Sequence, residues 1–175
     1  MQKVRLGNSD IQVSKICLGS MTWGVQNSQL DASKQIEYAL SRGVNFIDTA
    51  EMYAVPPSPE TYGKTEKIIG NWLSANPKKR NELVVASKIA GNGLPWIRNG
   101  ADITGEAIIA SVDASLKRLQ TDYIDLYQLH WPNRTSPHFA KHWPGKITFT
   151  DVDTEHHSNE MLEILQALND CVQSG

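Results

Sequence analysis

Residues 83–89 read Leu-Val-Val-Ala-Ser-Lys-Ile, a short apolar run with one lysine near its end. Three further short apolar runs occupy residues 16–20, 45–50 and 123–130. Segments with a helical spacing of apolar residues lie between and after these runs. An order in which short strands alternate with helices predicts an α/β fold, in which a parallel sheet is covered by helices.

Four helices are expected from the spacing of the apolar residues and from the residues that commonly begin and end helices. The first spans residues 31–42 and stops at Gly43, and the second spans residues 61–75. The third starts after Thr104 as its N-cap, and the fourth runs from residue 158 to residue 175. Their apolar faces are expected to contain Ile36, Leu40, Ile68, Ile69, Trp72, Leu73, Ile108, Val112, Leu116, Leu119, Leu162, Leu165 and Leu168.

A small hairpin is expected ahead of the first parallel strand. Apolar residues alternate in residues 4–6 and 11–13, on either side of Gly7-Asn8-Ser9-Asp10, which suits a tight turn. Four βα units then follow, whereas a closed (β/α)8 barrel typically needs about 250 residues. The 175 residues therefore predict one incomplete domain, either the N-terminal half of a TIM-type barrel or a small open sheet of four strands.

Composition narrows the classes of function. With 17 Lys and Arg against 19 Asp and Glu, the net charge of −2 argues against a broadly basic nucleic-acid binder. No run approaches the roughly 20 apolar residues of a membrane-spanning helix, and no apolar segment follows residues 1–5 as in a secretory signal. Cys17 and Cys171 form no CxxC pair, which favours a reducing compartment, the cytoplasm. Both cysteines are interpreted as packing residues.

Two long loops follow strands on the side where α/β proteins bind ligands. The first covers residues 52–60, which include three prolines, and the second covers residues 131–157. His138 and His142 in the second loop have a spacing that a helix could use for a metal, but no helix pattern or cysteine pair accompanies them. We expect no metal site. Gly63-Lys64-Thr65 lacks the earlier glycine of a phosphate-binding loop and falls within an expected helix.

Polar residues stand at the ends of three predicted strands. Asp48 ends the second strand, Lys88 ends the third, and His130 ends the fourth. Tyr53 follows Asp48 by five residues. Because the carboxyl ends of parallel strands meet at one edge of the sheet, these four side chains can converge on one site.

The four residue types suit the reduction of a carbonyl group. A buried lysine needs a counter-charge, which Asp48 can supply. The Lys88 cation beside Tyr53 is expected to lower the pKa of the phenol, so that Tyr53 can give a proton to the developing alkoxide. A neutral His130 can donate a hydrogen bond to the same oxygen. The hydride must come from a cofactor.

Simpler interpretations compete with this one. An aspartate or lysine at a strand end is often a solvated terminus or a structural ion pair, and a tyrosine in a proline-rich loop is often a packing residue. Trp23 and Trp131 are read as packing residues at the rim. A different barrel chemistry also remains open, such as an isomerase that uses Lys88 as its base.

The same residues resemble the aldo-keto reductases. The resemblance rests on residues 46–53 (Phe-Ile-Asp-Thr-Ala-Glu-Met-Tyr), residues 86–88 (Ala-Ser-Lys) and residues 122–132, which end in Leu-His-Trp-Pro. Residues 18–24 look like the first strand and loop of that family, and residues 55–57 and 70–73 are similar to its bacterial Tas-type branch. The four motifs occur in order and cover essentially the whole chain.

The resemblance implies a (β/α)8 barrel and NADPH-dependent reduction of aldehydes or ketones to alcohols. By motif, Tyr53 would be the general acid, Lys88 the residue that lowers its pKa, Asp48 the partner of Lys88, and His130 the residue that orients the carbonyl. Asp48 also lies at a cofactor-binding position of the family.

Thr22 and Trp23 match family positions near the nicotinamide-ribose end of the cofactor. The partner expected is a small carbonyl substrate, with no nucleic acid and no membrane. The open sheet edges predict association with a second copy or with a C-terminal half. The alternative function is that of an inactive fragment, or of a regulatory or assembly subunit that keeps the fold.

Overall fold

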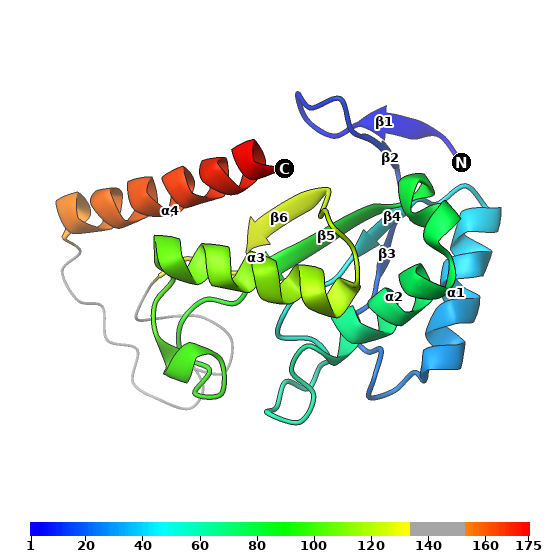
Figure 1. The fold of residues 1–175 in the computed structure, drawn as a ribbon, viewed down its shortest axis with the longest axis horizontal. Helices are drawn as coiled ribbons and strands as arrows, with labels where there is room; N and C mark the ends of the chain where they lie inside the picture. The colour runs from blue at the N-terminus through cyan, green and yellow to red at the C-terminus, as the bar shows by residue number, and fades with distance from the viewer. Residues whose placement is uncertain (134–152) are drawn as a thin grey trace. The chain divides into compact units, whose positions relative to one another are not determined.

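The structure is a computed structural model, and it describes residues 1–133 and 153–175. The chain forms two compact units. The first comprises Met1–Ile89 and Ser111–Gln128, and the second comprises Ala90–Ala110 and the described part of Leu129–Gly175. Figure 1 shows the helices and strands along the chain.

Four strands form one sheet in the order β3-β4-β5-β6. They are β3 (Cys17–Gly19), β4 (Phe46–Asp48), β5 (Val84–Ile89) and β6 (Leu126–Leu129). β3 and β4 pair in parallel, as do β4 and β5, with Asp48 opposite Gly19 on one side and Ala86 on the other. Each strand is followed by a helix in the chain, so the predicted series of four βα units is confirmed. Among the described residues, these four strands form an open sheet that does not close into a barrel.

The predicted hairpin is also present. It joins β1 (Lys3–Arg5) to β2 (Gln12–Ser14), with Val4 opposite Val13. The backbone N–H of Leu6 donates to the carbonyl of Ile11 at 2.9 Å and closes the turn. Gly7 has a φ of +57°, which glycine adopts without the steric penalty that a side chain brings.

The helices are α1 (Gln29–Ser41), α2 (Lys64–Ala75), α3 (Gly105–Leu119) and α4 (Thr154–Ser174), with short 3-10 helices at Pro77–Glu82 and Arg98–Gly100. α1 begins two residues earlier than predicted because Ser28 and Asp31 form a reciprocal capping box. α2 begins three residues later, because residues 61–63 form a turn that ends in Gly63 at φ +72°. Thr104 caps α3 as expected, through a hydrogen bond from the Ala107 N–H to its hydroxyl.

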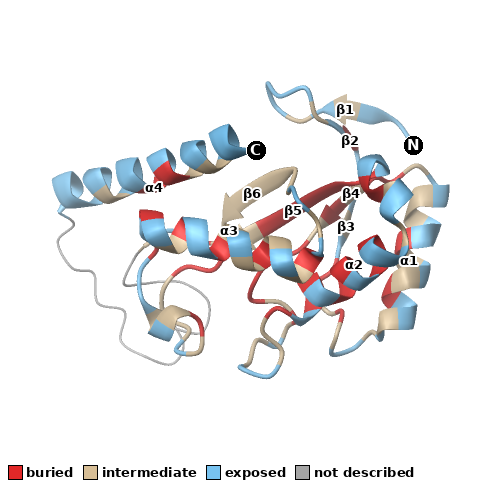
Figure 2. Cartoon of the chain, viewed as in Figure 1, coloured by how far each residue is buried: buried red, intermediate tan, exposed pale blue. Residues whose placement is uncertain are grey.

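The first unit has a core between the sheet and its helices, which Figure 2 shows as buried segments of the strands and of α2. Ile36 of α1 and all four predicted residues of α2 are buried, as expected. The core also contains Trp23, Ile47, Val85 and Leu119. These contacts fix the strands that hold the polar residues described below.

The buried face of α3 differs from the prediction. Ile108 and Leu119 are buried, but Val112 and Leu116 are only half-buried. Ser111 and Ser115 take the buried positions instead. Small side chains are needed there because α3 runs close to α2, where Gly70 lies against the backbone of Arg118.

The prediction for α4 is wrong in two respects. The helix begins at Thr154 rather than at residue 158, because the Asp153 carboxylate accepts a hydrogen bond from the His156 N–H and caps it. Leu162 and Leu165 are exposed and Leu168 is half-buried, whereas Ile164 and Ala167 are buried. The buried face is set within the second unit, where the Glu163 carboxylate accepts from the N–H of Gly105 at 3.0 Å.

Candidate active site

Asp48 and Lys88 form an ion pair at the carboxyl ends of β4 and β5. Lys88 Nζ lies 2.7 Å from Asp48 Oδ2 and 2.7 Å from the carbonyl oxygen of Thr49. The Lys88 side chain is 13% exposed and the Asp48 side chain 31%. The carboxylate and the carbonyl hold the Lys88 ammonium from two sides, so this ion pair has a fixed position at the end of the sheet.

Tyr53 lies beside this pair. It is half-buried in the loop after β4, and Lys88 Nζ is 5.2 Å from the centroid of its ring. Its N–H donates to the carbonyl of Ala50 at 3.1 Å, and its carbonyl accepts from the N–H of Thr65 in α2. The structure therefore brings together three of the four residues predicted for catalysis.

The pKa of Tyr53 is shifted upward overall, whereas the sequence predicted that Lys88 lowers it. Burial raises the pKa of the Tyr53 phenol above its usual range, and the nearby Asp48 carboxylate raises it further. The physical reason is that a partly desolvated place disfavours the charged phenolate, and the negative charge of Asp48 disfavours it further. Tyr53 is therefore fully protonated at neutral pH.

Cys17 is an exposed residue near the same pair, which corrects its interpretation as a packing residue. Partial burial of the thiol and the Asp48 carboxylate raise its pKa to about 11, against a smaller opposite effect of Lys88. The alternation of β3 places Cys17 and Gly19 on one face and Leu18 on the other, toward the core. Cys171 on α4 is half-buried.

The two residues expected near a cofactor differ in accessibility. Thr22 is half-buried, and its hydroxyl donates to Asn27 Oδ1 at 2.8 Å. Trp23 is only 1% exposed, lies in the core of the first unit, and donates from its indole to Gln35 at 2.8 Å. Its ring is thus occupied by packing, and only its backbone could meet a bound molecule.

His130, the fourth predicted residue, belongs to the second unit, directly after β6. It is half-buried, and its ring lies 5.2 Å from that of Trp131 at a tilt of 46°. Trp131 is buried and donates from its indole to the carbonyl of Asn92 at 3.2 Å. Gly91 allows this packing, since a side chain there would clash with the indole.

Sequence reasoning missed a buried ion pair between α2 and α3, on the face of the sheet opposite to Lys88. Glu66 in the first turn of α2 is fully buried and pairs with Arg118 of α3, with 2.6 Å between Arg118 Nε and Glu66 Oε2. Ser87 of β5 donates to the other oxygen of Glu66 at 2.5 Å. Glu51, in the loop that contains Tyr53, is also fully buried. The available signal was a glutamate in phase with the apolar residues Ile69 and Leu73 of the same helix.

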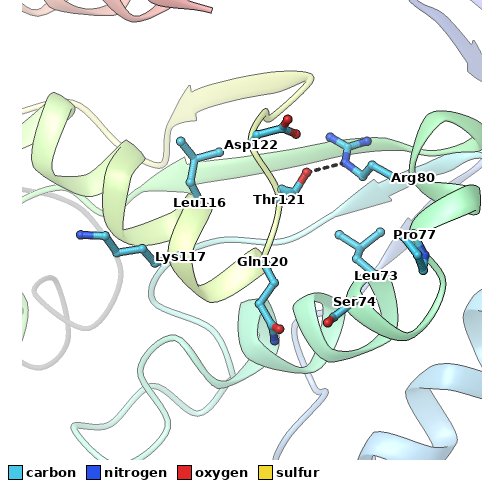
Figure 3. A pocket seen from close by; sticks show the side chains of 9 residues that line it. All are labelled: Leu73, Ser74, Pro77, Arg80, Leu116, Lys117, Gln120, Thr121 and Asp122. Atoms are coloured by element: carbon cyan, nitrogen blue, oxygen red, sulfur yellow. Dashed lines mark hydrogen bonds between the residues drawn. The ribbon is translucent and has the colours of Figure 1, made fainter.

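A hollow lies where α2, the 3-10 helix Pro77–Glu82 and the end of α3 meet. It is an open hollow of about 640 Å³, lined in part by Leu73, Leu116 and Lys117 (Figure 3). Arg80 at its edge donates to Thr121 Oγ1, to the carbonyl oxygens of Leu83 and Tyr123, and to Asp125 Oδ2, all within 3.1 Å. Arg80 therefore links the 3-10 helix Pro77–Glu82 to residues 121–125, which lead into β6.

The predictions about the second long loop lie mostly outside the described residues, including those for His138 and His142. Within residues 1–133 and 153–175, no group of three or more His, Cys, Asp or Glu side chains could hold a metal ion. In the same ranges no helix is long and apolar enough to cross a membrane.

Consecutive βα units with polar residues at the carboxyl ends of the strands are typical of enzymes built on the (β/α)8 barrel. The sequence model of the Aldo/keto reductase family matches residues 15–175. The chain belongs to this family, whose fold is the (β/α)8 barrel, and its four units form a partial barrel. The small independent open sheet is thereby set aside.

Several curated proteins are similar to the chain. Protein tas of Escherichia coli is 43% identical over 178 residues, covering all of this chain and 49% of its own length. Norsolorinic acid reductase B of Aspergillus parasiticus is 33% identical over 95% of this chain and 39% of its own length. The 6-dehydroglucose reductase of Novosphingobium aromaticivorans is 36% identical over 74% of this chain and 41% of its own length. The chain thus spans at most about half the length of these relatives.

Proposed function

We propose that this chain contributes the proton-donating half of an NADPH-dependent carbonyl reductase, which converts aldehydes or ketones to alcohols in the full-length protein. The observation that carries the proposal is the group formed by Asp48, Lys88 and Tyr53. Family membership supports an oxidoreductase, and two of the similar proteins are named as reductases.

The residues of this group take the following roles. Tyr53 donates the proton to the carbonyl oxygen as the alkoxide develops, and the raised pKa keeps this proton in place at neutral pH. Lys88 places a positive charge beside the phenolate that forms, and Asp48 holds Lys88 in position. His130 orients the substrate by a hydrogen bond to the same oxygen.

The accessible groups fit one end of a nicotinamide cofactor, which would supply the hydride when bound. Asp48 presents a partly exposed carboxylate and Thr22 a half-buried hydroxyl, both able to bond ribose hydroxyls. Trp23 would contribute through its backbone, since its ring is in the core. We propose NADPH rather than NADH because the aldo-keto reductases, which this chain resembles, use NADPH.

The geometry disfavours an isomerase that uses Lys88 as its base. Lys88 Nζ donates hydrogen bonds to both Asp48 and the Thr49 carbonyl, whereas a general base must accept a proton from its substrate.

The test is a carbonyl-reduction assay on a full-length protein that carries these 175 residues. With NADPH and an aromatic aldehyde, we expect oxidation of the nucleotide that depends on the aldehyde. Nucleotide binding without any turnover would contradict the proposal and favour a regulatory or assembly subunit that keeps the fold.

A further inference from the structure

The buried partners of Ser87 are placed so that they can fix the position of Lys88. Ser87 and Lys88 are neighbours on β5 and point to opposite faces of the sheet. Lys88 reaches Asp48 on one face, while Ser87 donates to Glu66 at 2.5 Å on the other. Any shift of Ser87 along the strand would therefore also shift Lys88.

Glu66 links this strand to α3. Its side chain is fully buried, with one oxygen bonded to Ser87 and the other 2.6 Å from Arg118 Nε. Arg118 also donates to Ser115, which is fully buried. The three elements β5, α2 and α3 thus meet at one carboxylate.

Arg118 also borders the loop that contains Tyr53. The Glu51 N–H donates to the carbonyl of Lys88 at 3.1 Å, and the Glu51 carbonyl accepts from the Gly63 N–H at 2.9 Å. A side chain at Gly63 would come within 2.6 Å of Arg118 Cδ, so the end of this loop packs directly on the arginine. Arg118 is therefore connected to Lys88 through Glu66 and Ser87, and to the loop of Tyr53 through Gly63.

Stability alone does not explain this arrangement. Replacing a buried ion pair by apolar residues of similar volume is often neutral or stabilising, whereas a carboxylate with each oxygen bonded to a different element fixes their relative geometry. We infer that Arg118, acting through Glu66 and Ser87, is a positioning residue that sets the place of Lys88 and Tyr53 at the candidate active site. This inference rests on the proposed function for its catalytic meaning.

The test is nuclear magnetic resonance of the protein labelled with ¹³C at lysine Cε and tyrosine Cζ. The signals of Lys88 and Tyr53 are assigned from the spectra of Lys88→Met and Tyr53→Phe. We expect Ser87→Ala and Arg118→Lys each to move both signals at neutral pH. Arg80→Lys is the matched control, because Arg80 is a comparably buried arginine that pairs with Asp125 at 2.8 Å.

The control should lose thermal stability without moving either signal. Unmoved Lys88 and Tyr53 signals in folded Ser87→Ala would overturn the inference, and so would equal movements in Arg80→Lys. If Arg118→Lys does not fold, Ser87→Ala decides the question, since it leaves both charges in place.

A kinetic measurement on the full-length protein separates this inference from the proposed function. Ser87→Ala should lower kcat by about tenfold and leave KM within about twofold, because misplaced groups slow the reaction more than they weaken binding. Moved signals in a protein without reductase activity would reject the proposed function and keep the positioning role.

Discussion

At the scale of single residues, the candidate active site is built around the ion pair of Asp48 and Lys88. Asp48 and Lys88 end neighbouring parallel strands, and this topology alone brings them within 2.7 Å. The direction of the pKa shift of Tyr53 depends on its burial and on the nearby charge of Asp48, and a strand pattern does not contain the extent of burial. Glu51 and Glu66 were missed because their burial depends on packing between elements.

Lys88→Met tests the energetic role of the ion pair. It leaves the partly buried Asp48 carboxylate without its cation, so we expect the free energy of unfolding to fall by about 1–3 kcal/mol. Chemical denaturation measures the change. Lys79→Met is the control, because the ion pair of Lys79 with Glu37 is exposed. Its loss should lower the free energy of unfolding by less than about 1 kcal/mol. Equal losses in both variants would show that the Asp48–Lys88 pair has no special role in stability.

Cys17 gives a test of the electrostatics beside Asp48. A pKa raised from 9.0 to about 11 leaves about 100-fold less thiolate near neutral pH, partly offset by the greater reactivity of each thiolate. In a Cys171→Ser background, alkylation of Cys17 should be about tenfold slower in the folded chain than in urea. The stabilising effect of the raised pKa is complete below pH 9 and is lost as the pH rises through about 11. Equal alkylation rates in the two states would contradict the assignment.

At the scale of helices and strands, periodicity located the elements well and their ends less well. Each strand of the four-stranded sheet lies within its predicted apolar run, and Gly43 follows α1 at a φ of +75°. The start of α1 was predicted two residues too late, because the capping box of Ser28 and Asp31 determines where the helix begins. The exposed face of α4 could not be predicted, because a helix with apolar residues on several sides needs a neighbour to decide which side is buried.

Gly70→Ala tests the close approach of α2 to α3. An added Cβ would clash with the backbone carbonyl of Arg118. The free energy of unfolding should therefore fall by about 1–3 kcal/mol, despite the better helix propensity of alanine. The control is Gly19→Ala, where no atom lies within 4 Å of the added carbon. A Gly70→Ala variant as stable as the parent protein would show that the helices lie further apart.

At the scale of the whole molecule, the sheet has β3 and β6 at its edges. Ile16 beside β3 is 55% exposed, and Leu162 and Leu165 on α4 are exposed as well. Unpaired strand edges with exposed apolar residues favour association. Sedimentation of the 175-residue chain at micromolar concentration should therefore give a mass above 19.5 kDa. A monomer that unfolds cooperatively would contradict this expectation.

The order of strands and helices was enough to predict four βα units, because each unit can be recognised from local patterns. The choice between a partial barrel and a small open sheet was not available from periodicity, since both have the same four units. Family membership decided it.

The most direct test of the central claim is single-turnover reduction of an aromatic aldehyde by the full-length protein with Tyr53→Phe. We predict a loss of at least about 100-fold in the rate, as expected for removal of a general acid, with unchanged binding of NADPH. Tyr38→Phe serves as the control, because Tyr38 is 63% exposed on α1. Turnover by Tyr53→Phe at the rate of the unmodified enzyme would contradict the role of Tyr53 as the proton donor.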